Sequence, residues 1–111
     1  MADNRKYYYL KLKENFFDSD SIVLLEDMKD GILYSNILLK LYLKSLKNGG
    51  RLQLDEHIPY TAQMIATLTR HQIGTVERAL AIFQQLGLVE QLDCGLLYMT
   101  DIELMIGQSS T

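Results

Sequence analysis

Residues 61–87, TAQMIATLTRHQIGTVERALAIFQQLG, predict two helices separated by a tight turn. Thr61 can cap the first helix, over about residues 62–68, because its hydroxyl can accept a hydrogen bond from the first turn. The second helix is predicted over residues 73–86, where apolar side chains recur at steps of three and four, the spacing of one buried helix face. Gly87 follows as a C-cap. This second helix is the clearest element of the sequence.

Downstream of the helix pair, two short apolar runs at residues 88–92 and 96–99 predict a β-hairpin. The runs are joined by residues 93–95, DCG, whose glycine can adopt the positive φ that a tight hairpin needs. The following segment, DIELMIG at residues 101–107, has no clear pattern. Residues 108–111, QSST, are interpreted as a polar tail.

Upstream, a longer helix is predicted from about Ile32 to Lys47, and the Asn48-Gly49-Gly50 turn ends it. Asp30 can cap its start. Apolar groups cover most of this helix, so we expect it to be the central, most buried one. Its narrow polar stripe consists of Asn36, Lys40, Lys44 and Lys47. The alternating run at residues 51–54 predicts a short strand after it.

The N-terminal segment alternates over residues 7–13, which predicts a half-buried strand. One side of this strand carries Tyr8, Leu10 and Leu12, and the other carries Tyr7, Tyr9, Lys11 and Lys13. The DSDS cluster at residues 18–21 then offers N-cap oxygens for a helix of about two turns. On that helix Ile22, Leu25 and Met28 are expected to share one face.

A central helix, a short strand, two helices around a turn and a hairpin follow in the order of a winged helix-turn-helix domain. The predicted fold class is therefore α+β, mainly α with a small β-hairpin. We divide the chain into a strand-and-helix extension over residues 1–30, a winged-helix core over 31–107 and a tail over 108–111. A length of 111 residues fits one such domain.

The second helix of such a pair enters the major groove of DNA with its N-terminal residues near base edges. On this helix the residues predicted to contact DNA are Gln72, Thr75 and Arg78. The alternative is an ordinary solvated helix face. Glu77 stands where many DNA-reading winged helices carry an arginine, and the hairpin loop has no Lys or Arg to hold a phosphate.

Other cations and aromatic residues suggest further contacts. The candidate phosphate contacts are Lys40, Lys44, Lys47 and Arg70. For the lysines the alternative is the exposed side of a buried helix. Tyr7 and Tyr9 are predicted to mediate self-association. They lie beside a basic arm that could instead let them stack on bases, formed by Arg5, Lys6, Lys11 and Lys13.

Charge and composition exclude several classes of protein. The net charge of −3 argues mildly against nucleic acid, but residues 1–50 sum to +1 and residues 51–111 to −4, so a basic surface is expected mainly in the N-terminal half. No apolar run approaches the roughly 18 residues of a membrane helix, so we expect a soluble, cytoplasmic protein with no membrane partner. His57, His71 and Cys94 lack the spacing of a metal site or catalytic pair, so we expect no metal, no cofactor and no enzyme activity.

Three segments carry a family resemblance: KYYYLKLKENFFDSDSIVLLE, LLKLYLKSLKNGGRLQLDEHIPYTAQMIATLT and TVERALAIFQQLGLVE. Together they resemble the N-terminal domain of phage replisome organiser proteins, from Lys6 to about Gly107, and such proteins are similar to DnaD-like primosome components. The resemblance implies a non-catalytic protein of the bacterial host cytoplasm that binds a replication origin, oligomerises and helps to bring the helicase to DNA. It also implies that the chain is the N-terminal part of a longer protein.

Two classes of function remain open on the residues alone. The first is a DNA-binding domain for phage replication initiation, with double-stranded origin DNA, a homo-oligomeric partner and a helicase or helicase loader as its partners. The second is a protein-interaction and oligomerisation module on a winged-helix scaffold. Transcriptional regulation shares that scaffold and is a further alternative.

Overall fold

The structure is a computed structural model, and it describes residues 6–110. These residues form an α+β fold with antiparallel sheets. Its α-helices are α1 (Asp20–Asp27), α2 (Gly31–Ser45), α3 (Ala62–Thr69) and α4 (Ile73–Gln85). Its strands are β1 (Lys6–Leu10), β2 (Arg51–Asp55), β3 (Ile58–Pro59), β4 (Val89–Gln91), β5 (Leu97–Met99) and β6 (Ile106–Ser110). Short 3-10 turns include η1 (Phe16–Asp18) and η2 (Leu46–Asn48).

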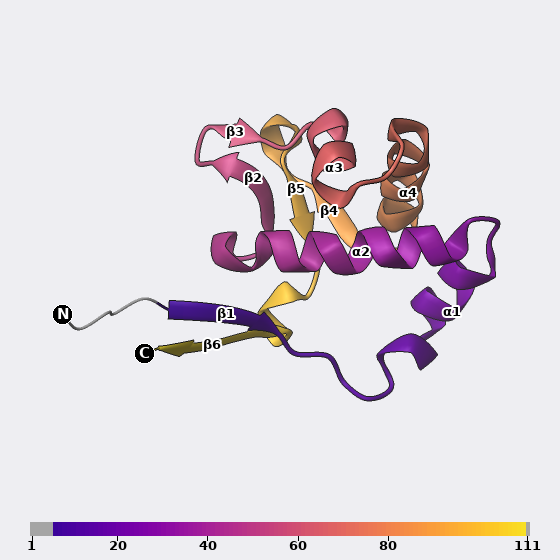
Figure 1. Cartoon of the computed structure of the whole chain (residues 1–111), viewed down its shortest axis with the longest axis horizontal. Helices are drawn as coiled ribbons and strands as arrows, with labels where there is room; N and C mark the ends of the chain where they lie inside the picture. The colour runs from indigo at the N-terminus through magenta and orange to yellow at the C-terminus, as the bar shows by residue number, and fades with distance from the viewer. Residues whose placement is uncertain (1–5, 111) are drawn as a thin grey trace.

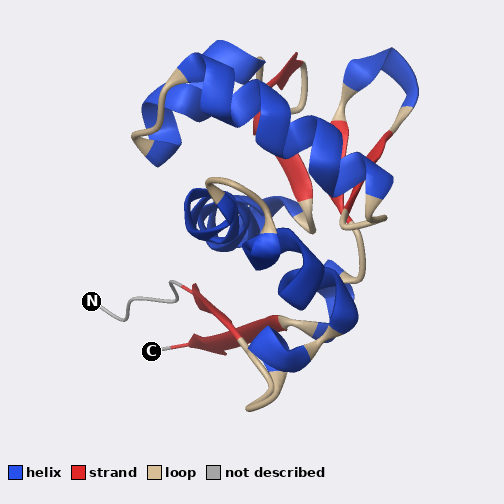
Figure 2. Ribbon diagram, turned by 90° about the vertical axis from the view of Figure 1, so that its right-hand side faces the viewer, coloured by secondary structure: helices blue, strands red, loops and turns tan. Residues whose placement is uncertain are grey.

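The long helix α2 crosses the middle of the molecule and divides it into two sides (Figure 1). On one side lie α3, α4 and a four-stranded sheet in the order β3-β2-β5-β4. On the other side lie α1 and a two-stranded ribbon, β1-β6. Figure 2, turned by 90°, shows the same division, with α2 seen nearly end-on between the two sides.

The core follows from this central position of α2. Ile37, Leu38 and Leu41 of α2 are buried, as the sequence predicted for its most apolar helix. Phe83 of α4 is fully buried against the same cluster. Burial of such side chains contributes roughly 1.5–3 kcal/mol each, so α2 and α4 supply much of the stability.

The predicted helix pair is confirmed, including its ends. The hydroxyl of Thr61 accepts a hydrogen bond from the backbone N–H of Met64 at 3.1 Å, as an N-cap does. Gly87 has a φ of 75° immediately after the last turn of α4, as expected of a C-cap glycine. Two other predicted caps are wrong: Asp30 and, from the DSDS cluster, Ser19 stand at the N-cap positions of α2 and α1, but neither side chain makes a capping bond.

The predicted hairpin of β4 and β5 is confirmed, with Val89 opposite Met99. β2 joins β5 by antiparallel pairing, so the short strand predicted at residues 51–54 becomes part of the same sheet. Both Cys94, with φ 67°, and Gly95, with φ 79°, turn the chain between β4 and β5. β3 and its pairing with β2 were not predicted.

The predicted polar tail is wrong. Residues 108–110 belong to β6, which pairs antiparallel with β1 in a register that sets Tyr9 opposite Gly107. The ring of Tyr9 covers Gly107 so closely that a side chain at residue 107 would collide with it. β1 also ends at Leu10, so Leu12 lies outside the strand and is exposed rather than inward. Tyr8 and Leu10 do pack against the core, as predicted.

Among the described residues, no helix combines the length and the apolar character needed to cross a membrane.

Candidate nucleic-acid interface

The outward face of α4 carries Glu77, Arg78, Ala81 and Gln85, all exposed, and Gln72 is exposed at its N-cap. Thr75 was predicted on this face, and that prediction is wrong: only 7 % of Thr75 is exposed. Thr75, Ala79 and Phe83 follow one another at steps of four, so they share the buried face of the helix. Counting Ala79 as part of the apolar stripe would have found this from the sequence.

Arg78 is exposed, but its side chain also makes contacts within the protein. Its Nε donates to the hydroxyl of Tyr34 at 3.4 Å, and its Nη2 donates to Oγ1 of Thr75 at 3.5 Å. Both distances are long for such bonds, and a guanidinium has five N–H donors. Thr75 therefore contacts the Arg78 guanidinium from the buried face of α4, and the guanidinium has further N–H groups that can donate to a ligand.

The turn between α3 and α4 is fastened to α2 by Lys40. The Lys40 ammonium donates to the carbonyl oxygen of Thr69, the last residue of α3, at 2.8 Å. A helix end leaves its last carbonyls without intrahelical partners and favours a cation there. Lys40 is half-buried in this position and so less open to solvent than Lys44 and Lys47, and its phosphate contact stays a prediction.

A second bond ties the same turn to α2. The His71 Nε2 lies 2.8 Å from Oδ1 of Asn36, a geometry in which the ring N–H donates to the amide oxygen. Partial burial lowers the pKa of His71 below its ordinary value, and the nearby Lys40 ammonium lowers it further. The neutral ring thus suits this site, and the polar stripe of α2 serves to position the helix pair.

The other predicted cations lie in two places. Arg70 is exposed in the turn itself, where it adopts a left-handed conformation with φ 62°. Lys44 and Lys47 are exposed toward the C-terminal end of α2, in its last turn and in η2. Arg70 and Gln72 therefore lie in the turn, Arg78 lies further along α4, and the two lysines lie at the C-terminal end of α2 and in η2.

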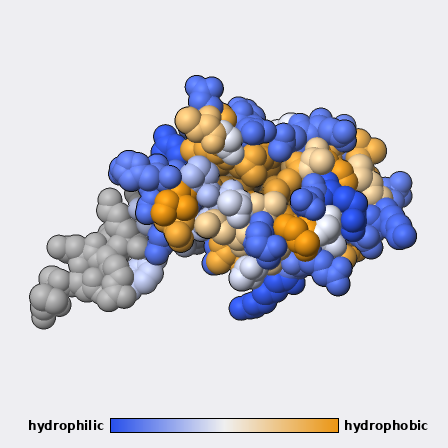
Figure 3. Space-filling view, turned by 90° about the horizontal axis from the view of Figure 1, so that it is seen from above, coloured by the Kyte–Doolittle hydropathy of each residue, from blue (hydrophilic) through white to orange (hydrophobic). Residues whose placement is uncertain are grey.

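The remaining surface near α4 offers few cations. Between Leu88 and Met99 the hairpin carries Glu90 and Asp93 and no Lys or Arg. Seen from the side of α3, α4 and the sheet, hydrophilic residues alternate with separate hydrophobic ones (Figure 3). A nucleic acid on this side would be held by the turn and α4, and not by the hairpin.

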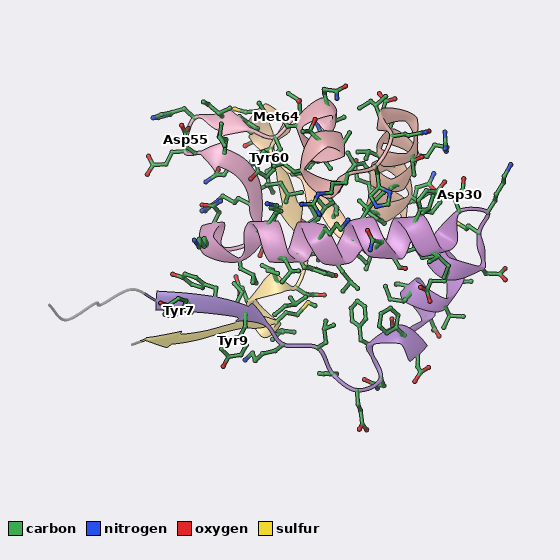
Figure 4. The ribbon with its side chains drawn as sticks, viewed as in Figure 1. Tyr7, Tyr9, Asp30, Asp55, Tyr60 and Met64 are labelled. Atoms are coloured by element: carbon green, nitrogen blue, oxygen red, sulfur yellow. The ribbon has the colours of Figure 1, made fainter. Side chains whose placement is uncertain are left out.

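Tyr7 and Tyr9 lie on the β1-β6 ribbon, on the other side of α2 from α4 (Figure 4). They are 46 % and 51 % exposed. Lys11 and Lys13 of the predicted basic arm are exposed nearby, and Arg5 falls outside the described residues. The tyrosines are therefore separated from the predicted reading helix.

Metal ligands do not gather in the described part of the chain, where no three His, Cys, Asp or Glu side chains form a group that could hold an ion. His57 lies in the turn after β2, where its backbone N–H donates to Oδ1 of Asp55 at 2.8 Å. Cys94 is exposed at the hairpin turn.

Comparison with known proteins gives one match. Residues 9–111 match the family model described as N-terminal phage replisome organiser. The match covers nearly all of the chain, and its description concerns the organisation of the phage replisome. No curated protein and no solved structure shows a significant similarity.

Proposed function

Because the chain belongs to the N-terminal phage replisome organiser family, we propose that it is a winged helix-turn-helix domain that binds double-stranded DNA at a replication origin. In this proposal α3 and α4 are the helix pair, α4 is the recognition helix, and the β4-β5 hairpin is the wing. Bound at the origin, the domain helps to assemble the complex that loads the helicase.

The α3-turn-α4 unit is the observation that carries the proposal. Its turn is tied to α2 through the bonds of Lys40 and of Asn36, while the outward face of α4 stays open. The sheet order β2-β5-β4 and the chain order of a helix, a strand, two helices and a hairpin support the winged-helix assignment. A helix held rigidly from behind and open in front suits insertion into a major groove.

The reading side chains in this proposal are Gln72 and Arg78. An arginine can donate two hydrogen bonds to guanine, and a glutamine can pair with adenine. Arg70 in the turn and Lys44 on α2 are the proposed phosphate contacts, which position the protein without reading sequence. Glu77 on the same face and the overall charge of −3 imply modest affinity and a steep salt dependence.

The test is binding of Arg78→Ala and wild type to two kinds of duplex at matched salt. One set is tiled across the surrounding genome to find the preferred site, and the other is random. Loss of Arg78 should weaken the preferred site by about 1–3 kcal/mol and leave random duplex almost unchanged, because it removes a base contact. Lys44→Ala should weaken both kinds of duplex alike.

Lys29→Ala is the matched control, because it removes one exposed positive charge from the loop between α1 and α2, outside the proposed contacts. It should leave DNA binding unchanged. Equal losses for Arg78→Ala on both duplexes would make α4 a phosphate anchor rather than a reader. No loss on either duplex would reject DNA recognition by α4 and favour the interaction module.

A second role, self-association, is favoured by the β1-β6 ribbon. Within residues 6–110 the outer edges of this two-stranded sheet have no strand partner, and Tyr7 and Tyr9 are exposed on it. Open edges pair readily with another chain, and a dimer is the commonest assembly. Tyr7→Lys should lower the sedimentation mass, since an edge lysine opposes strand pairing. A wild-type chain that is already monomeric at high micromolar concentration would reject this role.

A further inference from the structure

The negative charge of the chain is concentrated around α1. Residues 14–30 hold six carboxylates and one lysine, whereas the whole chain has a net charge of −3. The rest of the chain is therefore slightly positive, at +2. The N-terminal half as a whole sums to +1 because it also contains all seven lysines of the chain. The segment around α1 is thus the most acidic stretch of the chain, and its charge opposes the binding of DNA there.

Apolar side chains stand among these carboxylates without belonging to the core. α1 buries Ile22 and Leu25 against α2, while Val23 and Leu24 are 51 % and 57 % exposed. With Phe17, which is also exposed, they line a shallow hollow of about 420 Å³.

Asp20 and Asp27 flank this apolar centre along the helix. They lie seven residues apart, with Val23 and Leu24 between them, so all four share the outward face at helical spacing. We name this surface, with Phe17, the α1 outer face.

The α1 outer face is held in a defined position. Gly31 begins α2 so close to α1 that a Cβ there would lie 2.5 Å from the carbonyl oxygens of Leu25 and Glu26. The hydroxyl of Ser35 also donates to Oε2 of Glu26 at 2.7 Å. Only glycine permits this contact between the two helices, and the bond from Ser35 adds to it. The apolar centre is therefore presented by a fixed helix rather than by a loop.

We infer that the α1 outer face binds a basic, amphipathic helix of a partner protein. Leucine-like side chains of that helix would cover Val23, Leu24 and Phe17, and its flanking Lys or Arg residues would meet Asp20 and Asp27. A groove that takes an amphipathic helix has this combination of apolar anchors and complementary charge at its rim. The inference stands on α1 alone and does not depend on DNA binding by α4.

A second copy of this chain fits the α1 outer face poorly. In a two-fold symmetric dimer the same surface meets itself, so Asp20 and Asp27 of both copies would face each other. Like charges at an interface cost several kcal/mol. A basic partner is favoured because its positive charges attract Asp20 and Asp27. Because α1 and α4 lie on opposite sides of α2, the partner and DNA can be bound together (Figure 1).

The test uses a fluorescent synthetic helix of about four turns with leucine on one face and lysine on the other, and the whole chain as its receptor. Val23→Ser with Leu24→Ser should weaken binding by about tenfold, which corresponds to about 1.4 kcal/mol, since the change removes two apolar anchors from the centre of the surface. Asp20→Asn with Asp27→Asn should weaken it less and make it less dependent on salt.

Leu54→Ser with Leu104→Ser is the matched control. It removes two apolar side chains of similar or greater exposure from other parts of the surface, and it should leave peptide binding unchanged. A peptide of the same composition in scrambled order should bind weakly, and one with glutamate in place of lysine should not bind. All variants should keep their thermal unfolding midpoint and their DNA binding, which separates this test from that of α4.

Several results would overturn the inference. An equal loss of peptide affinity in the Val23/Leu24 variant and in the control would show non-specific binding to exposed apolar side chains. Equal binding of the scrambled peptide would show that an amphipathic helix is not what is recognised. Equal binding of the glutamate peptide would show that the charge of Asp20 and Asp27 plays no part. A sedimentation mass that falls when Val23 and Leu24 are replaced would assign the surface to a second copy of the chain.

Discussion

On the α4 side of α2, one helix buries five residues, including Val76, Ala79 and Phe83, whereas on the other side α1 buries two, Ile22 and Leu25. The α4 side is also tied to α2 by the polar bonds of Lys40 and His71. α1 is held to α2 by the close approach at Gly31 and by one polar bond, from Ser35 to Glu26. More buried apolar surface gives higher local stability, so α4 is expected to be the more stable helix and α1 the first to open.

The largest effect is expected from the core beneath α4. Phe83→Ala should lower the free energy of unfolding by about 3 kcal/mol or more, because it leaves a cavity in a fully buried site. Leu104→Ala, at a residue that is 75 % exposed, should change it by less than about 0.5 kcal/mol. Urea unfolding monitored by circular dichroism measures both. A small effect of Phe83→Ala would contradict the place of Phe83 in the core beneath α4.

Two glycine substitutions should act in opposite directions and so sharpen the comparison. Gly31→Ala should destabilise the fold by about 1–3 kcal/mol, since its methyl group collides with backbone carbonyls of α1. Gly74→Ala should stabilise α4 by about 0.5–1 kcal/mol, because the nearest atom is 3.5 Å away and alanine favours helix.

Amide hydrogen exchange locates these two effects. Protection in α1 should fall in Gly31→Ala and stay unchanged in Gly74→Ala. If protection falls equally in α1 and α4, the two sides of α2 unfold as one unit and the comparison fails.

Two lysines on α2 provide a smaller, matched test. Lys40→Ala should lower the free energy of unfolding by about 1–3 kcal/mol, because the carbonyl of Thr69 loses its charged donor. Lys44→Ala, at an exposed residue, should change it by less than about 0.5 kcal/mol. Thermal unfolding compares them. Equal effects would mean that Lys40 does not position the helix pair.

The smallest effect is expected from pH. The pKa of His71 is lowered in the folded protein, chiefly by burial and then by Lys40, so the unfolded chain binds the proton more tightly. The contribution of His71 to stability is therefore complete above the ordinary pKa of about 6.5. It is lost as the pH falls from there through the lowered pKa.

Urea unfolding at neutral and mildly acidic pH checks this. His71→Gln should flatten this part of the profile, and His57→Gln, in the exposed turn after β2, should leave it unchanged. An NMR titration of His71 gives its pKa directly. A pKa above the ordinary value would reverse the predicted slope.

Most helices could be predicted from the sequence because the signals are local. Each signal acts within a few residues of its own position: the apolar stripe on α4, the hydroxyl of Thr61 and the turn at Gly87. Periodicity and caps therefore placed the ends of α3 and α4 to within about a residue. The same holds for the hairpin of β4 and β5. The predicted caps failed because Asp30 adopts a left-handed φ of 65° and because the hydroxyl of Ser19, in the DSDS cluster, donates to the carbonyl of Phe16 instead.

The candidate site was predictable only in part. Exposure of Gln72 and Arg78 follows from the helical period, and so does burial of Thr75 once Ala79 is counted with Phe83. The partner of Lys40 is a carbonyl 29 residues away. A lysine on a polar stripe looks the same in sequence whether it meets solvent or a helix end.

The sequence by itself determined which segments are helical, which faces are apolar and where the carboxylates gather, because each depends on neighbours along the chain. Only the tertiary structure decided that β6 pairs with β1, that α2 separates α4 from α1, and that Lys40 and Asn36 hold the turn. These contacts join residues far apart in the chain. Their free energy comes from burial and pairing that exist only once the chain has folded.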